Sequence, residues 1–144
     1  GSFETHLVAA HTPEAAALCR RLVADRDVLV QCYLPSVADY GERALVWIDG
    51  EFTHAVRKSP RFAADEERVS EALTITAAER AVGTAALAPV RDRLLYARVD
   101  VAPGPTGEPL VMELELVEPS LFLLQSPPTL DRFVAAIRRR VAAS

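Results

Sequence analysis

Four charged side chains in two neighbouring segments carry the strongest chemical signal in this sequence. Arg98 and Asp100 lie in an alternating run that ends at Val101, and Glu113 and Glu115 lie in a second such run after a loop rich in proline and glycine. Side chains two apart on a β-strand point to the same face. If the two runs pair as an antiparallel hairpin with their apolar faces aligned, these four side chains converge on one patch.

Three carboxylates so close together repel one another unless a cation neutralises them. Carboxylate oxygens are the hard ligands that Mg²⁺ and Mn²⁺ prefer. The pattern therefore predicts a divalent-metal site at Asp100, Glu113 and Glu115. The alternative is an ordinary polar strand face in contact with water, which needs no ligand to explain it.

Composition limits the classes of protein that this chain can be. With 144 residues, of which 50% are hydrophobic and 25% charged, it is expected to form a single globular domain over residues 1–144. A net charge of −4 gives no general attraction for nucleic acid or an anionic membrane. No apolar stretch approaches transmembrane length and no secretory signal is visible. Cys19 and Cys32 form neither a disulfide framework nor a zinc pair, so a reduced, cytoplasmic protein is expected.

Helix signals occur at three places in the chain. Thr12 followed by Pro13 predicts a helix to about residue 24, and Thr76 predicts a second helix to about residue 87. Thr129 is expected to cap a final helix whose apolar residues form a buried stripe: Phe133, Val134, Ile137 and Val141.

Strand signals surround these helices. Residues 7–10 are expected to end a strand, and residues 27–34 to form one. Asp49-Gly50 predicts a tight hairpin between residues 42–48 and 51–57, in which Ile48 faces Glu51, Trp47 faces Phe52 and Glu42 faces Arg57. Residues 59–72 are charged and irregular, and a mobile loop is expected there. Together the elements predict an α+β fold, a mostly antiparallel sheet with helices packed on one face.

Five short motifs follow one another along the chain: Gln31-Cys32-Tyr33-Leu34-Pro35, Gly41-Glu42, Asp49-Gly50, Lys58-Ser59-Pro60, and Asp100 followed by Glu113-Leu114-Glu115 and Pro119. In this order and spacing they resemble the C-terminal half of ATP-grasp ligases. The branch concerned holds bacterial glutathione synthetase, ribosomal-protein glutamate ligases and the cyclo-ligase of cycloserine biosynthesis. Residues 54–58 and 96–122 are most similar to the cycloserine type, and the resemblance covers nearly the whole chain.

The resemblance implies an enzyme that uses ATP and Mg²⁺, with Mn²⁺ as a substitute, in antibiotic biosynthesis. A small-molecule carboxylic acid would be phosphorylated to an acyl phosphate, which an amine or similar nucleophile then attacks. Asp100, Glu113 and Glu115 would be the metal ligands. The backbone of Gln31, Cys32, Tyr33 and Leu34 would contact the adenine, and Glu42 would contact the ribose. Lys58 would contact the phosphates, and Arg98 would orient the acid.

Plainer interpretations of the same residues stay open. Residues 31–34 alone read as a core strand, and Glu42 can pair with Arg57 instead of a ribose. Arg57 is an alternative to Arg98 as the group that grips a substrate carboxylate. His54 lies among apolar neighbours, where a histidine is more often structural than a general base.

The chain also departs from the family pattern. Glu115 stands where the family has Asn, and residues 61–72 contain no glycine where a Gly-Gly pair is usual. The part ahead of the glycine-rich phosphate loop is absent, and Gly1-Ser2 is either the end of that loop or a remnant of the expression vector. A fragment that is inactive alone is therefore expected. The alternatives are a non-catalytic nucleotide-binding or interaction domain, and a module that associates with itself as a homodimer.

Overall fold

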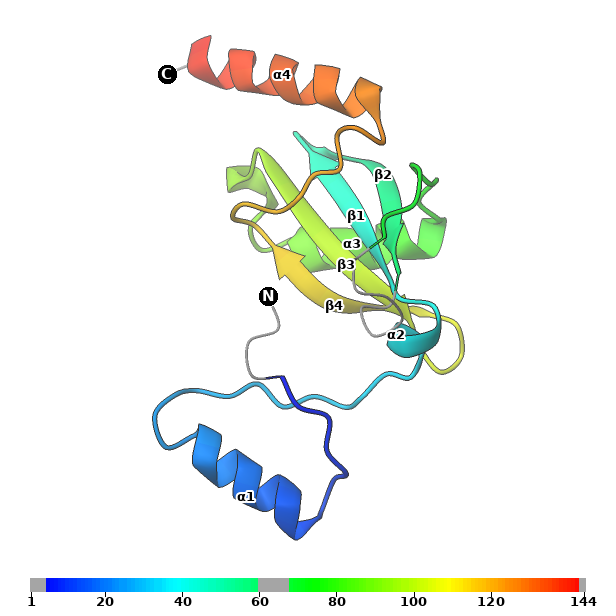
Figure 1. Ribbon diagram of the computed structural model, residues 1–144. Coiled ribbons are helices and arrows are strands. Elements are labelled where there is room, and N and C mark those ends of the chain that lie inside the picture. The colour runs from blue at the N-terminus through cyan, green and yellow to red at the C-terminus, as the bar shows by residue number, and fades with distance from the viewer. Residues whose placement is uncertain (1–4, 60–67, 143–144) are drawn as a thin grey trace. The chain divides into compact units, whose positions relative to one another are not determined.

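The computed structural model describes residues 5–59 and 68–142 (Figure 1). The chain forms two compact units, Gly1–Tyr33 and Leu34–Ser144. A single domain over residues 1–144 stays a prediction. The expectations for Gly1-Ser2 and for most of the loop after Ser59, residues 60–67, lie outside the described residues.

The first unit is built on α1 (Pro13–Leu22). As predicted, Thr12 caps this helix: its hydroxyl oxygen accepts a hydrogen bond of 3.1 Å from the backbone N–H of Ala15. The strands predicted at residues 7–10 and 27–34 are wrong, because the structure has no strand in either range. Leu29 and Val30 are 87% and 79% exposed, so this apolar run has no sheet to join within its unit.

The second unit is built on a four-stranded sheet. Its strands are β1 (Glu42–Ile48), β2 (Glu51–Lys58), β3 (Tyr96–Pro103) and β4 (Pro109–Glu115), in the order β2-β1-β3-β4. Every neighbouring pair is antiparallel. Single bridges from Val69 and Leu73 pair with the outer edge of β2. The predicted α+β class with an antiparallel sheet is confirmed.

One face of the sheet packs against α3 (Ala77–Leu87), as Figure 1 shows. Thr76 caps this helix as predicted, and Glu79 completes a capping box by accepting from the Thr76 backbone N–H at 2.8 Å. Gly83 faces the ring of Phe52, where any side chain would collide with it. The buried cluster on this face consists of Leu45, Trp47, Phe52, Ala55, Ile75, Leu87, Ala97, Val99 and Val101.

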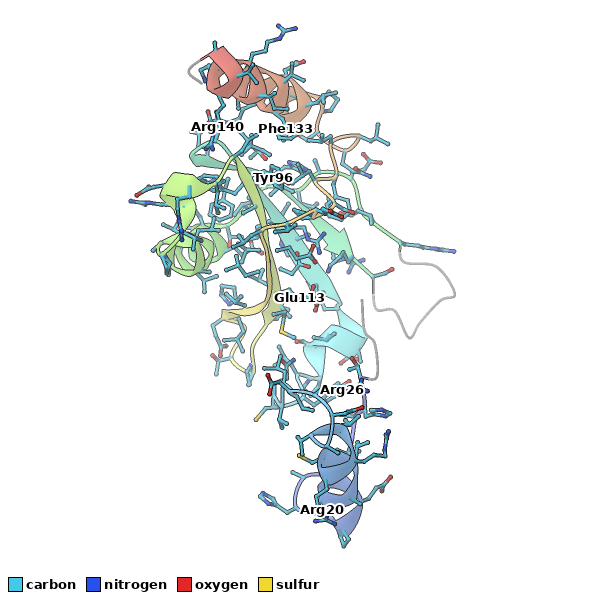
Figure 2. The ribbon with its side chains drawn as sticks, turned by 90° about the vertical axis from the view of Figure 1, so that its left-hand side faces the viewer. Arg20, Arg26, Tyr96, Glu113, Phe133 and Arg140 are labelled. Carbon is cyan, nitrogen blue, oxygen red and sulfur yellow. The ribbon has the colours of Figure 1, made fainter. Side chains whose placement is uncertain are left out.

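The remaining helices are short α2 (Ser36–Asp39), a 3₁₀ turn (Arg91–Arg93) and α4 (Pro127–Ala142). The last of these lies at the β1–β2 turn, where Arg132 Nε donates to the Ile48 carbonyl at 3.0 Å. In Figure 2, Phe133 meets Tyr96 beneath α4, edge to face with ring centroids 5.8 Å apart.

Two predictions for α4 are wrong. The helix begins at Pro127, so Thr129 is a buried residue of its first turn and not its cap. The predicted buried stripe is also incomplete. Phe133 is half-buried, but Val134, Ile137 and Val141 are 38%, 39% and 72% exposed, and Ala136 is the residue that is fully buried. The end of a sheet offers a helix a smaller apolar area to pack against than a sheet face does. The sheet therefore covers only part of the apolar stripe of α4.

A β-bulge corrects the predicted hairpin register. Asp49 and Gly50 take positive φ angles of 45° and 92°, as a tight two-residue turn requires, and the predicted pairs next to the turn are confirmed. Beyond them Val46 pairs with His54, which leaves Thr53 as an extra residue. Glu42 therefore faces Lys58 and not Arg57.

A second bulge lies between β3 and β4. Asp100 pairs with Glu113, but its neighbour Val101 pairs with Val111, so Met112 is the extra residue. Strict alternation along β4 would place Met112 on the same face as Leu114. The bulge ends that alternation and places Val111 opposite Val101 instead.

Candidate functional site

The predicted convergence of three carboxylates is present on the sheet face opposite α3. Arg98 pairs with Glu115 across the β3–β4 ladder, and Asp100 pairs with Glu113. Each of these three residues, Asp100, Glu113 and Glu115, offers one carboxylate oxygen, and the three oxygens lie within 4.8 Å of one another. Asp100 is fully buried, Glu115 is partly buried and Glu113 is exposed on β4, where Figure 2 labels it. The cluster thus has a closed floor and an open side.

Two cations occupy the floor of this cluster. Lys58 Nζ lies 2.6 Å from Asp100 Oδ2 and 2.8 Å from Glu42 Oε2. Arg98 grips Asp100 with two nitrogens, Nε at 2.8 Å from Oδ1 and Nη2 at 2.9 Å from Oδ2, and it also pairs with Glu115. Four carboxylates and two cations leave a formal charge of −2. The repulsion among the carboxylates is therefore relieved in part by the protein's own side chains.

The bulge at Thr53 brings Lys58 to this face. Without the extra residue Arg57 would stand opposite Glu42, and Lys58 would point to the other side of the sheet. In the structure Arg57 is exposed, with its guanidinium carbon 5.2 Å from the centre of the Tyr40 ring. Arg57 is therefore not part of the carboxylate cluster.

Two further contacts hold Arg98. Its Nη1 donates to the Ser120 carbonyl at 3.4 Å, and its guanidinium carbon lies 5.7 Å from the centre of the Phe122 ring. Phe122 has a left-handed backbone with φ of 48°, which is uncommon for a bulky side chain. Sequence spacing alone gave no signal for these contacts, because the segment after β4 has no regular period.

The pKa values of the site follow from burial and from these ion pairs. Burial alone would lower the pKa of Lys58, but Asp100 and Glu42 outweigh it and the pKa is raised. The same holds for Arg98, where burial is outweighed by Asp100, Glu115 and Glu113. Burial raises the pKa of Glu115, Arg98 opposes this, and Asp100 and Glu113 add to the rise. Both cations are therefore firmly protonated at neutral pH.

His54 occupies the same sheet face but makes neutral contacts. It is 4% exposed, and its Nδ1 lies 3.1 Å from Thr53 Oγ1 and 3.2 Å from Thr129 Oγ1. Its Nε2 is buried without a hydrogen-bond partner among the described residues. Burial lowers the pKa of His54, and the Phe122 backbone opposes this. These contacts join β2 to α4 and fit the structural interpretation.

The residues assigned to adenine lie elsewhere in the chain. Gln31, Cys32 and Tyr33 belong to the first unit and are exposed. Leu34 is half-buried, and its carbonyl accepts from the Val37 N–H at 3.1 Å. The structure brings six of the predicted residues together, namely Glu42, Lys58, Arg98, Asp100, Glu113 and Glu115, and the adenine assignment stays a prediction.

The donor set of the cluster fits a divalent cation such as Mg²⁺. It consists entirely of carboxylate oxygens, which are hard ligands, and the four carboxylates and two cations of the cluster together carry a formal charge of −2, which matches a doubly charged ion. Glu113 and Glu115 offer oxygens on the open side. Both oxygens of Asp100 already accept hydrogen bonds from Lys58 and Arg98, so an ion there shares this carboxylate with resident cations.

Comparisons with known proteins identify relatives of this chain. The cycloserine biosynthesis protein DcsG of Streptomyces lavendulae is 33% identical over 141 residues, which cover 90% of this chain and 47% of that protein. The crystal structure of D-cycloserine synthetase DcsG superposes with a TM-score of 0.65 at 34% identity, over 75% of this chain and 40% of that chain. The chain thus spans about half the length of these relatives.

A weaker likeness is to the ATP-grasp ligase PsnB in complex with the precursor peptide PsnA2 and AMPPNP. It has a TM-score of 0.44 at 24% identity, over 67% of this chain and 32% of that chain. No family model matches the chain. Among the described residues there is also no helix with the length and apolar character needed to cross a membrane.

Proposed function

We propose that this chain is a member of the ATP-grasp superfamily, near its cycloserine branch, and that it is the nucleotide- and Mg²⁺-binding half of an ATP-dependent carboxylate–amine ligase. One observation carries the proposal. Two adjacent antiparallel strands place Asp100, Glu113 and Glu115 with oxygens within 4.8 Å of one another, flanked by Arg98 and Lys58. Such a set serves phosphoryl transfer, which depends mainly on positioning and on neutralising charge.

Each residue of the cluster then has a role. Asp100, Glu113 and Glu115 hold the ion, which supplies neutralisation of the charge on the transferred phosphoryl group. Lys58 contacts phosphate oxygens as a compact positive charge, and Glu42 contacts the ribose or keeps Lys58 in place. Arg98 orients the substrate carboxylate, since its planar guanidinium suits two parallel hydrogen bonds. The buried floor excludes water from beneath the reacting groups.

The proposed reaction joins a small carboxylic acid to an amine through an acyl phosphate, with release of ADP and phosphate. The name of D-cycloserine synthetase supports a place in the biosynthesis of a small antibiotic. Because the chain matches about half of that protein, catalysis is proposed for the protein in which both halves are present, and little or none for these residues alone. Two free, exposed thiols at Cys19 and Cys32 support a reducing, cytoplasmic setting.

A second candidate function is a nucleotide-binding or interaction domain without catalysis. The burial of Asp100 favours it, because this carboxylate is already neutralised by two cations. Glu115 in place of the family's Asn points the same way. The two candidates differ in what the full-length protein does with ATP.

Thermal unfolding tests the nucleotide site first. The melting temperature is measured with ADP or ATP, each with and without Mg²⁺, for the wild type and for Glu113→Gln. Stabilisation that needs both nucleotide and Mg²⁺, and that Glu113→Gln removes, supports the site. No stabilisation in the wild type at millimolar nucleotide contradicts it.

Turnover of the full-length protein then separates the two candidates. ADP release is measured with Mg-ATP and a panel of amino acids and hydroxyamino acids. Release that depends on one acid and one nucleophile supports the ligase. Nucleotide binding without ADP release across the panel supports the non-catalytic domain.

A further inference from the structure

Lys58 is the single lysine of the sequence, and it occupies an unusual position. Its side chain is 7% exposed, and its Nζ lies between Asp100 Oδ2 at 2.6 Å and Glu42 Oε2 at 2.8 Å. The Asp100 oxygen that it contacts belongs to the carboxylate cluster proposed above as a metal site. Lys58 therefore holds a carboxylate that a divalent ion would also need.

A divalent ion and the Lys58 ammonium would compete for the Asp100 carboxylate and repel each other. An ion coordinated by Asp100 would place two positive charges within a few ångströms of Nζ, where the low dielectric of a buried floor makes repulsion strong. The carboxylate has about four lone-pair sites, and three N–H groups already use most of them. Because the positive charges repel one another, one of the two resident cations is expected to loosen when such an ion enters.

The contacts indicate which cation that is. Arg98 holds Asp100 with two nitrogens and is also bound to Glu115, to the Ser120 carbonyl and to the Phe122 ring. Lys58 makes one contact with Asp100, and its other partner is Glu42, which is more exposed. Loss of the Asp100 contact leaves Lys58 paired with Glu42, whereas loss of Arg98 would break several contacts together.

We propose that Lys58 is a displaceable counter-ion: it neutralises Asp100 while no metal is bound, and it leaves Asp100 for Glu42 and for an anionic ligand when a divalent cation binds. This inference rests on the metal site of the proposed function. Its consequence is that metal entry sets free the positive charge that a phosphate needs. A divalent cation then favours the binding of a polyphosphate in two ways: it contacts the phosphate oxygens itself, and it frees the Lys58 ammonium to contact them too.

The first test measures Mn²⁺ binding without nucleotide, by electron paramagnetic resonance at about 0.15 M salt. In Lys58→Met the competitor is removed, so Mn²⁺ is expected to bind about tenfold more tightly than in the wild type. Arg57→Met is the matched control, since it removes the same charge from the adjacent position on the opposite face. The Mn²⁺ affinity of Arg57→Met is expected to differ from that of the wild type by less than about threefold. Salt screens the charge of Arg57 from an ion on the other face of the sheet.

The second test uses the wild type alone and needs no variant to fold. An amine-reactive reagent can modify the Lys58 amine and the chain's terminal amine, and mass spectrometry separates the two. Addition of Mg²⁺ is expected to raise the labelling rate of Lys58 several-fold, with a half-maximal effect at the concentration that saturates the site. The terminal amine should react at an unchanged rate.

The outcomes separate this inference from the function on which it rests. Wild-type binding of Mn²⁺ that Lys58→Met leaves unchanged or weakens, or Lys58 labelling that Mg²⁺ does not alter, overturns the counter-ion role and leaves the metal site standing. Absence of Mn²⁺ binding in both the wild type and Lys58→Met overturns the metal site itself. Binding that appears in Lys58→Met alone supports the competition directly.

Discussion

Lys58 and Asp100 are 42 residues apart in the sequence and lie on strands that do not pair, yet Lys58 Nζ lies 2.6 Å from Asp100 Oδ2. The strand between them is β1, which presents Ala44 opposite Asp100 and Glu42 opposite Lys58. Ala44 is fully buried, and its small side chain leaves room above β1 for the lysine to cross. One ion-pair network therefore joins β2, β1 and β3 on the sheet face opposite α3.

Neutralising Asp100 is expected to destabilise the protein even in the absence of metal. Asp100→Asn leaves Lys58 and Arg98 with one fewer carboxylate on a buried floor, and breaking a buried ion pair in this way costs about 3–5 kcal/mol. Urea unfolding in EDTA measures the loss. The matched control is Glu113→Gln on the exposed side, which should cost less than about 1 kcal/mol. Equal effects of the two variants would contradict the role of Asp100 as the centre of the network.

Metal removal is expected to leave the fold intact. Lys58 and Arg98 already offset part of the negative charge in the cluster, so the carboxylates do not need an ion to remain together. The melting temperature in EDTA should lie within about 2 °C of the value in Mg²⁺ without nucleotide. Mg²⁺ that binds weakly to the folded protein adds little to its stability. Circular dichroism that shows unfolding in EDTA would mean that the resident cations are insufficient.

Restoring the family's residue at position 115 is expected to separate two roles of Glu115. Glu115→Asn keeps a carbonyl oxygen as a ligand but removes the charged partner of Arg98. The Mg²⁺-dependent stabilisation by nucleotide should persist, whereas Glu113→Gln should abolish it. The experiment is a thermal shift with Mg-ADP. Loss of the shift in Glu115→Asn as well would show that the negative charge at position 115 is needed.

Alanine at position 83 is expected to destabilise a helix that it would normally strengthen. Replacing Gly by Ala in a helix interior usually gains about 1 kcal/mol. Here the new Cβ would lie 2.6 Å from Phe52 Cζ, so the ring must move, and overpacking costs about 1–3 kcal/mol. Urea unfolding of Gly83→Ala alone and together with Phe52→Leu forms the test. The substitution should become neutral or stabilising when the ring is removed.

His54 is expected to make the second unit less stable in mild acid. Its folded-state pKa is lowered by burial, so between that value and the ordinary value of about 6.5 the unfolded chain binds more protons. Stability is therefore lost as pH falls below about 6.5, by up to about 1.4 kcal/mol per pH unit. The raised pKa of Glu115 acts in the opposite direction at lower pH.

Two variants test this pH dependence. Urea unfolding at pH 7.5, 6.5 and 5.5 should give a smaller slope for His54→Gln than for the wild type. His6→Gln changes an exposed histidine of the first unit and should leave the slope unchanged. An unchanged slope in His54→Gln would assign the acid sensitivity to other groups.

Several features of this protein follow from local sequence alone. Asp49-Gly50 specifies its tight turn because both residues tolerate a positive φ, and Thr12 and Thr76 specify helix starts because their hydroxyl oxygens accept from backbone N–H groups. The two-residue spacing of Arg98 and Asp100, and of Glu113 and Glu115, puts each pair on one strand face. A short-range pattern suffices here because each feature depends on neighbours only a few residues away.

Tertiary structure decided the rest of the site. The bulge at Thr53 adds one residue to β2 and turns Lys58 toward Asp100, and no local signal in the sequence announces it. The strand predicted at residues 27–34 did not form, because an apolar run becomes a strand only where a neighbour supplies hydrogen bonds. The sequence alone thus determined which carboxylates share a face. The three-dimensional packing decided that Lys58 and Arg98 neutralise them, because that contact depends on a register that only the assembled sheet defines.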